Sequence, residues 1–274
     1  MAATKIPNEL LELGVKAFGT SSIMIGDDAT GTIDAANYNT GLGVDVFAAL
    51  TTGDGNVALG YQALSSNTTG NNNIAIGRGT GDAVTTTFGL TAIGHGAAGA
   101  TTAGVTTAVG YTALTANTSG TYNTGLGAYA LQANTTASSN TAIGYVSMYA
   151  NTTGTKNVAT GYASLDACTT GSFNTAIGYN ALTNATTADG NTAIGNDSLN
   201  ATTTGHSNTG LGSGSLYANT TGDYGVAVGL NSLVANTTGA RNHAIGTFSL
   251  ASNVTGNYNT GLGYGTLNSN TVSQ

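Results

Sequence analysis

The chain has 274 residues, of which 42 are glycine and only 6% are charged, and it contains one proline, one cysteine and no tryptophan. Because 40% of the residues are hydrophobic while charge and proline are scarce, the composition is not that of a disordered chain. The net charge of −7 argues against the basic surfaces that bind nucleic acid or anionic membranes.

The first 20 residues (1–20) lie outside any repeat and have two alternative roles. Pro7 followed by NELLELGVKAF predicts a short helix that begins just after the proline. The segment would either cap the first coil of the domain that follows or attach the chain to another protein. It does not have the pattern of a signal peptide, and no apolar stretch of the chain has the length of a membrane span. The apolar residues that would make the attachment are Ile6, Leu10, Leu11 and Val15.

A glycine recurs at a fixed spacing from Gly26 to Gly263. Each step is 17 residues, except the step from Gly94 to Gly110, which is 16. Such a series indicates one supersecondary unit copied end to end, and therefore one elongated repeat domain rather than two globular ones. We assign this domain to residues 21–271, followed by a short tail at 272–274.

Aligned on this glycine as position zero, the unit reads N-T-A-I-G-Y-x-A-L-x-A-N-T-T-G-x-x. The recurring Gly, Asn and Thr exclude a helix, because each glycine costs about 1 kcal/mol relative to alanine inside a helix. Short strands joined by Gly and Asn turns fit the pattern instead. The sequence therefore predicts an all-β fold, a parallel β-solenoid or β-roll of about 15 coils.

Stacked coils would bring equivalent residues into columns about 4.8 Å apart. In the strand N-T-A-I-G, the small residue at −2 and the aliphatic residue at −1 lie on opposite faces. We expect the Ile and Leu columns to form the dry interior and the Asn column to hydrogen-bond along the stack. The expected columns are Ile76, Ile93, Ile143, Ile177, Ile194 and Ile245 at −1; Leu64, Leu131, Leu182, Leu199, Leu233 and Leu250 at +4; Asn123, Asn140, Asn174 and Asn191 at −4; and Gly144, Gly178, Gly195 and Gly246 at zero.

Each coil supplies only about two large apolar side chains. Burying one of them stabilises the fold by roughly 1.5–3 kcal/mol, whereas ordering the backbone costs roughly 1–2 kcal/mol per residue. So thin a core favours several chains that share one axis, and we expect a homotrimer. A monomeric prism held together by its backbone ladders is the alternative.

The repeat is irregular between Gly77 and Gly110. Position +4 holds Gly81 and Ala98 in this segment, and the 16-residue step falls in the same place. We therefore predict a bulge, a bend or a looser coil around residues 78–106.

Residues suited to chemistry are few and scattered. The segment GRGTGD at 77–82 lacks the ending of a phosphate-binding loop. The histidines His95, His206 and His243 occupy different positions in non-adjacent coils. We therefore expect no enzyme activity, no cofactor and no metal site in one chain. The alternative is an ion held by one histidine from each of three chains, for which His243 is the best placed.

Three further features have structural interpretations. Cys168 takes the place of a repeat Asn and is expected to be inert. The NTT triplets match glycosylation acceptors, but we expect them to be corner residues in Asn and Thr ladders. Tyrosines at position +1 would either cover a groove or form a carbohydrate-binding stripe. They are Tyr61, Tyr111, Tyr145, Tyr162, Tyr179 and Tyr264.

The units NVALGYQALSSNTTG (56–70) and NTAIGYNAL (174–182) resemble known repeats. The S/T-x-A-I-G strand is similar to the head repeats of trimeric autotransporter adhesins, which implies a left-handed parallel β-roll in a trimer. The longer unit, and the opening MAATKIPNELLELG, look like those of bacteriophage fibre proteins. The signal peptide and membrane anchor of the adhesins are not expected here. Because the chain stops within a repeat, a tip on another protein or a cleaved chaperone is expected.

The resemblance implies a structural fibre protein of a virus particle. Such a protein would be a homotrimeric spacer, attached by its N-terminus to a virion protein, that meets a polysaccharide or protein of the host surface. Two alternatives stay open. One is a self-assembling extracellular filament or adhesin joined through open coil edges. The other is an ice-binding solenoid, whose regular Thr columns would order water. None of these roles involves nucleic acid or membrane insertion.

Overall fold

The computed structural model describes residues 15–18, 22–25 and 35–271. They fall into two compact units, Met1–Asn123 and Thr124–Gln274, which we describe separately. The described residues form short strands and turns and contain no helix. Each unit is a parallel β-solenoid with one strand per coil, so the predicted all-β solenoid with 17-residue coils is confirmed.

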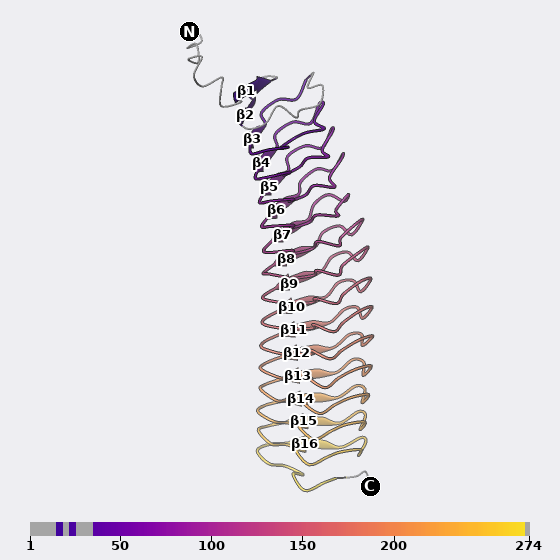
Figure 1. Ribbon diagram of the computed structural model, residues 1–274. Helices are drawn as coiled ribbons and strands as arrows, with labels where there is room; N and C mark the ends of the chain where they lie inside the picture. Colours follow the sequence, from indigo (N-terminus) through magenta and orange to yellow (C-terminus); the bar gives the residue numbers. More distant parts are fainter. Residues whose placement is uncertain (1–14, 19–21, 26–34, 272–274) are drawn as a thin grey trace. The chain divides into compact units, whose positions relative to one another are not determined.

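The strands of each unit follow one another in chain order (Figure 1). In the second unit, for example, Thr175 lies opposite Thr192 and Ile177 lies opposite Ile194, as the 17-residue spacing predicts. The first unit contains β1 (Val15–Phe18), β2 (Ser22–Ile25), β3 (Thr40–Leu42), β4 (Val57–Leu59), β5 (Ile74–Ile76), β6 (Thr91–Ile93) and β7 (Thr107–Val109). The second contains β8 (Thr124–Leu126), β9 (Thr141–Ile143), β10 (Val158–Thr160), β11 (Thr175–Ile177), β12 (Thr192–Ile194), β13 (Thr209–Leu211), β14 (Val226–Val228), β15 (His243–Ile245) and β16 (Thr260–Leu262).

The N-terminal segment differs from the helix expected there. Val15–Phe18 forms strand β1, which pairs antiparallel with β2 and places Val15 opposite Ile25. The pairing satisfies backbone groups that would otherwise form an open sheet edge, so these four residues cap the first coil. The other residues expected to form the helix or to make an attachment, Ile6, Leu10 and Leu11, lie outside the described residues.

The glycine at position zero is required by the backbone. Gly178 has a φ of 137°, which residues with a side chain rarely adopt. A Cβ atom on Gly178 would lie 2.5 Å from the carbonyl oxygen of Gly195 in the next coil. The recurring glycine therefore marks the point where successive coils make their closest backbone approach.

The interior contains the leucines at +4 but not the aliphatic residues at −1. The +4 leucines from Leu64 to Leu250 are fully buried, as are the small residues at −2, whereas Leu267 in the last coil is 49% exposed. Ile143, Ile177 and Ile245 are 36%, 38% and 45% exposed. The prediction that the −1 column lines the interior is therefore wrong for the single chain. From β3 onward the inner face of the strand carries only Ala or Gly, because other side chains already lie against it: a Cβ on Gly210 would lie 2.5 Å from Oγ of Ser198 and 3.4 Å from Cγ of Leu199.

The asparagines at −4 occupy the interior and form the predicted ladder. Asn157, Asn174 and Asn191 are almost completely buried. The backbone N–H of Asn174 donates to Oδ1 of Asn157 (2.9 Å), and the N–H of Asn191 donates to Oδ1 of Asn174 (3.0 Å). The side-chain amide of Asn174 also donates to the carbonyl of Ala188 (2.7 Å). Each Asn thus joins two coils and satisfies a backbone group that has no place in the strand ladder.

The NTT corners form the second predicted ladder. The side-chain amide of Asn151 donates to Oδ1 of Asn134 (2.9 Å), and the Thr152 hydroxyl donates to the carbonyl of Thr169 (2.9 Å). Asn134 and Asn151 are fully buried, so in the folded chain they are ladder residues rather than glycosylation acceptors. Cys168 occupies the same position and is buried. Burial raises the pKa of its thiol to about 11, in keeping with the expected inertness.

The irregular coils keep the strand register. Thr91 lies opposite Thr107, so no bulge interrupts β6 and β7. The missing residue is taken up in the turn at 103–104. Inside the neighbouring coil, Gly81 replaces the +4 leucine, and a Cβ on it would lie 3.1 Å from Cδ2 of Leu90. Leu90 and Val84, both fully buried, stand where other coils carry Asn and fill the space of the absent leucine.

Every regular coil also holds side chains in the left-handed region, which predicts a stabilising substitution. Val146, at position +2, has a φ of 49°, and Asn180 has a φ of 51° at the same position. A β-branched residue is strained at such a φ, whereas Asn tolerates it. We expect Val146→Asn to raise the free energy of unfolding by about 1 kcal/mol in urea titrations. Asn180→Val, the reverse change, should lower it by a similar amount, and equal stabilities would contradict the argument.

Candidate functional site

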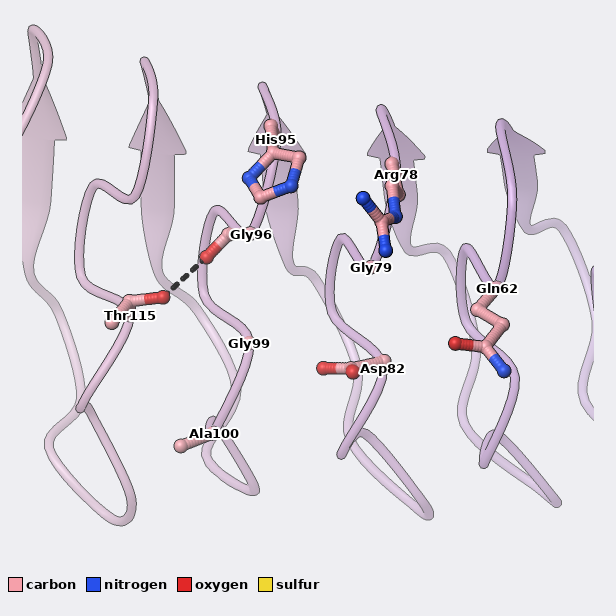
Figure 2. A pocket seen from close by; sticks show the side chains of 9 residues that line it. All are labelled: Gln62, Arg78, Gly79, Asp82, His95, Gly96, Gly99, Ala100 and Thr115. Atoms are coloured by element: carbon pink, nitrogen blue, oxygen red, sulfur yellow. Dashed lines mark hydrogen bonds between the residues drawn. The ribbon is translucent and has the colours of Figure 1, made fainter.

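The first unit contains a solvent-open pocket of about 450 Å³ over the irregular coils (Figure 2). It spans the coils that begin at Gly60, Gly77, Gly94 and Gly110. Figure 2 shows the Arg78 and His95 side chains above the turns that carry Asp82 and Thr115. The lining residues are Gln62, Arg78, Gly79, Asp82, His95, Gly96, Gly99, Ala100 and Thr115.

Two aromatic rings hold the basic side chains at the rim of this pocket. The guanidinium of Arg78 lies over the ring of Tyr61, with Cζ 5.8 Å from the ring centroid. The imidazole of His95 stacks on Tyr111, with ring centroids 5.3 Å apart and planes inclined by 14°. These four residues are the +1 residues of consecutive coils. Between Tyr61 and Tyr111, the predicted column of tyrosines therefore carries Arg78 and His95 instead.

Asp82 lies at the side of the pocket, at position +5. Its Oδ1 would be 3.4 Å from a Cβ built on Gly99. Burial raises the pKa of its carboxyl above the ordinary 3.8, and this effect exceeds the opposing one of backbone hydrogen bonds at Asp82 and Ala83. Within the described part of the chain, Asp82 and Arg78 form no ion pair.

Asp166 occupies the same position in the second unit, where three other coils place a hydrogen-bond donor: Thr115, Thr183 and Asn200. Thr115 donates to the carbonyl of Gly96 (2.5 Å) and Thr183 donates to that of Ala163 (2.9 Å). The equivalent carbonyl for Asp166 is that of Val146, to which an ionised carboxylate cannot donate. Oδ1 of Asp166 is buried without a hydrogen-bond partner, and burial raises the pKa of the carboxyl above 3.8.

This arrangement predicts a pH dependence of stability. Because the native pKa of Asp166 exceeds its unfolded value of about 3.8, the native state binds more protons between the two values. The carboxyl therefore favours the fold below 3.8, and this contribution is lost as pH rises through the native pKa. We expect Asp166→Asn to be more stable than the wild type at pH 7, and the difference in Tm to shrink as pH falls toward 4. A difference that stays constant with pH would contradict this account.

The outer face of the strands presents the second candidate surface. In the second unit, residues at −3 and −1 point away from the interior in every coil. Thr175 and Thr192 are half-buried, whereas Ile177 and Leu211 are 38% and 44% exposed. The first unit shows the same pattern, with Leu42 47% exposed. A column of exposed and half-buried aliphatic side chains, interrupted only by Thr160 in the second unit, thus covers the sheet of each unit, and threonines flank it in most coils. The predicted −1 residues Ile93, Ile143, Ile177 and Ile245 are exposed, and Ile76 and Ile194 are half-buried.

Three of the tyrosines at +1 in the second unit, Tyr145, Tyr162 and Tyr179, stack on one another, whereas Tyr264 meets Phe248 edge to face. Tyr145 and Tyr162 have ring centroids 5.6 Å apart, and Tyr162 and Tyr179 have centroids 5.1 Å apart with planes inclined by 11°. The ring faces between these three tyrosines are therefore covered, which leaves edges, hydroxyl groups and the outer face of Tyr179 for a partner. Stacking on sugar rings needs free faces, so this segment does not have the geometry of the carbohydrate stripe considered from the sequence.

A column that sequence reasoning missed lies at position −5. Arg241 lies between Tyr224 and Tyr258, with Cζ 5.2 and 5.5 Å from their ring centroids. Lys156 lies over the ring of Phe173 at 5.0 Å. The sequence signal that could have revealed these contacts is the placement of a basic residue 17 residues from an aromatic one. These exposed cation–π contacts are each worth about 0.5–1 kcal/mol.

The three histidines are not brought together. His206 accepts a hydrogen bond at Nδ1 from the backbone N–H of Asp189 (3.0 Å), and His243 is exposed on the outer face of β15. No three His, Cys, Asp or Glu residues gather in a metal-binding arrangement in the described ranges. Nor does the described chain contain a helix that is long and apolar enough to span a membrane.

Comparisons with protein-family models, curated proteins and solved structures give no match to this chain.

Proposed function

We propose that this chain is a structural fibre protein of a virus particle, in which three copies pack through their outer sheet faces and contribute to adhesion to a host surface. The observation that supports it best is the exposed aliphatic column at position −1. Monomeric proteins rarely expose contiguous apolar patches of this kind. A shared core would bury the column and supply the apolar area that a single chain lacks.

Two further features support a structural role. Backbone and Asn ladders repeat from coil to coil in each unit, which suits a spacer whose extent is set by its number of repeats. The repeat unit also resembles those of bacteriophage fibres and trimeric adhesin heads. Attachment to a virion protein through the N-terminal segment, and location on the virion, are parts of the same proposal.

Solution mass by light scattering tests the assembly. We expect the mass of three chains for the wild type and of one chain for Ile177→Lys combined with Leu211→Lys. The control is Thr187→Lys combined with Thr238→Lys, which adds the same charge at exposed corners and should keep the mass of three chains. A wild-type mass of one chain would overturn the shared core, whereas filaments without fixed length would favour an extracellular polymer. Labelling of virus particles by antibodies against the purified repeats tests the viral assignment.

Ice binding is a second candidate, because threonines recur in register on the same outer face. Thr175, Thr192 and Thr209 lie opposite one another in successive strands. A regular Thr array could order water only if no other chain covers it. Thermal hysteresis in a preparation with the mass of one chain would favour this role. Its absence would remove the candidate.

A further inference from the structure

The pocket of the first unit exists because three glycines stand where the coils that flank the pocket carry side chains. Gly79 and Gly96 occupy position +2, which holds Gln62 and Thr112 in the flanking coils. Gly99 occupies position +5. The fold does not require glycine at +2, because Gln62 and Thr112 adopt the same left-handed φ, 58° and 50°.

The glycines are not required by steric contact either. A Cβ on Gly96 would lie 3.6 Å from Cγ2 of Thr112, and one on Gly99 would lie 3.5 Å from Oγ1 of Thr115. Both are ordinary van der Waals distances. The absent side chains therefore leave space over the backbone and do not relieve a clash. Gly79, Gly96 and Gly99 form the floor of the pocket, and glycines at such a place allow a ligand to approach the backbone closely.

The groups around this floor differ in charge from one side to the other. Arg78 and His95 form the rim on one side, each placed against a tyrosine ring. Asp82 and Thr115 lie on the other side, and the Gln62 amide donates to Oδ2 of Asp45 (3.4 Å). The side chain of Arg78 makes no hydrogen bond or ion pair with any residue that the structure describes. Its guanidinium is thus free to pair with a carboxylate.

We infer that this pocket binds one acidic sugar residue, a uronic acid of a polysaccharide. The sugar carboxylate pairs with Arg78, and its hydroxyl groups hydrogen-bond with Asp82 and Thr115. A bare oxyanion such as phosphate fits less well, because Asp82 offers it a carboxylate instead of a donor. The pocket is open to solvent and crosses several coils, so the polymer can continue on both sides of the bound residue. The inference rests on the adhesive part of the proposed function, for which it names the ligand.

Calorimetry with an oligogalacturonate tests the inference, and the fully methyl-esterified oligomer is the matched neutral probe. We expect the wild type to bind the acid form at least ten-fold more tightly than the ester. Arg78→Gln, which removes the cation, and Gly96→Gln, which fills the floor, should each weaken binding at least ten-fold. Gly265→Gln introduces the same side chain at position +2 of the second unit, where a Cβ meets no atom within 4 Å, and should bind normally.

Three outcomes would overturn the inference. They are no binding of the acid form, equal binding of the ester, and binding that Gly96→Gln leaves unchanged. Competition by inorganic phosphate at equal concentration would instead identify a simple oxyanion site and would also refute it. Light scattering on the same variants separates the two proposals. If the protein binds the sugar but has the mass of one chain, the sugar site is supported and the trimer with a shared core is refuted. Circular dichroism melting checks that each variant is folded.

Discussion

Replacing Gly178 with alanine should lower the free energy of unfolding by about 3–5 kcal/mol. The new Cβ would lie 2.5 Å from the Gly195 carbonyl oxygen and 2.7 Å from its carbon, and backbone atoms cannot turn away as a side chain does. The φ of 137° adds conformational strain of about 1–3 kcal/mol. Two coils must therefore separate locally, which stretches ladder hydrogen bonds on both sides. Urea unfolding followed by circular dichroism measures the loss.

Gly190→Ala is the control for this prediction. Gly190 also has a positive φ, 68°, but a Cβ on it would lie 3.6 Å from its nearest neighbour, Oγ of Ser207. Only the left-handed conformation is penalised there, by about 1–2 kcal/mol. If the two substitutions cost the same, the close approach of coils at position zero is not what selects glycine.

Asn174→Ala should cost about 3 kcal/mol, the second large effect. Truncation leaves the backbone N–H of Asn191 and the carbonyl of Ala188 without their partners inside the protein. Each unsatisfied buried group costs about 1–3 kcal/mol. Asn174→Asp separates the two halves of the interaction, because a carboxylate still accepts from Asn191 but cannot donate to Ala188. The loss for Asn174→Asp should therefore diminish as pH falls and the carboxyl becomes protonated.

An exposed asparagine supplies the comparison for this ladder. Asn184 donates to the carbonyl of Asn200 (2.9 Å) at the surface, where water replaces the lost bond. Asn184→Ala should cost less than about 0.5 kcal/mol in the same urea titrations. A loss at Asn174 below 1 kcal/mol would mean that water enters the interior and takes over the role of the amide.

The solenoid could be predicted from the sequence because its main determinant is local. A glycine every 17 residues, with Asn and Thr at fixed offsets, excludes a helix and favours short strands joined by turns, one strand in each coil. The Asn ladder at −4 followed from the same spacing. Both predictions needed only the register, which β11 and β12 confirm by placing Ala176 opposite Ala193.

The side of the strand that faces inward could not be derived in the same way. Alternation shows that Ala176 and Ile177 lie on opposite faces, but not which face is inside. Hydrophobicity alone favoured Ile177, whereas the +4 leucine already fills the narrow interior of the coil. That leucine turns inward because the backbone at Leu182 has a φ of 52°, a conformation that propensities do not assign to leucine.

The pocket was missed for a related reason. The irregular segment 78–106 was recognised as a break in the pattern and was expected to loosen the coil. The structure shows that Leu90 and Val84 restore the interior, while the missing side chains at Gly79, Gly96 and Gly99 open the surface instead. A comparison of position +2 between neighbouring coils was the signal that could have located it.

Because each coil meets its neighbours through equivalent atoms, the chain is modular in whole repeats. Removal of residues 179–195 would bring Gly178 against Gly212, a junction chemically like the one that it replaces. Recombination between copies of the repeat therefore has an inherent unit of 17 codons and can change the coil number without new contacts having to evolve. The single 16-residue step, absorbed in one turn, shows that a smaller deletion survives where a corner rather than a strand shortens.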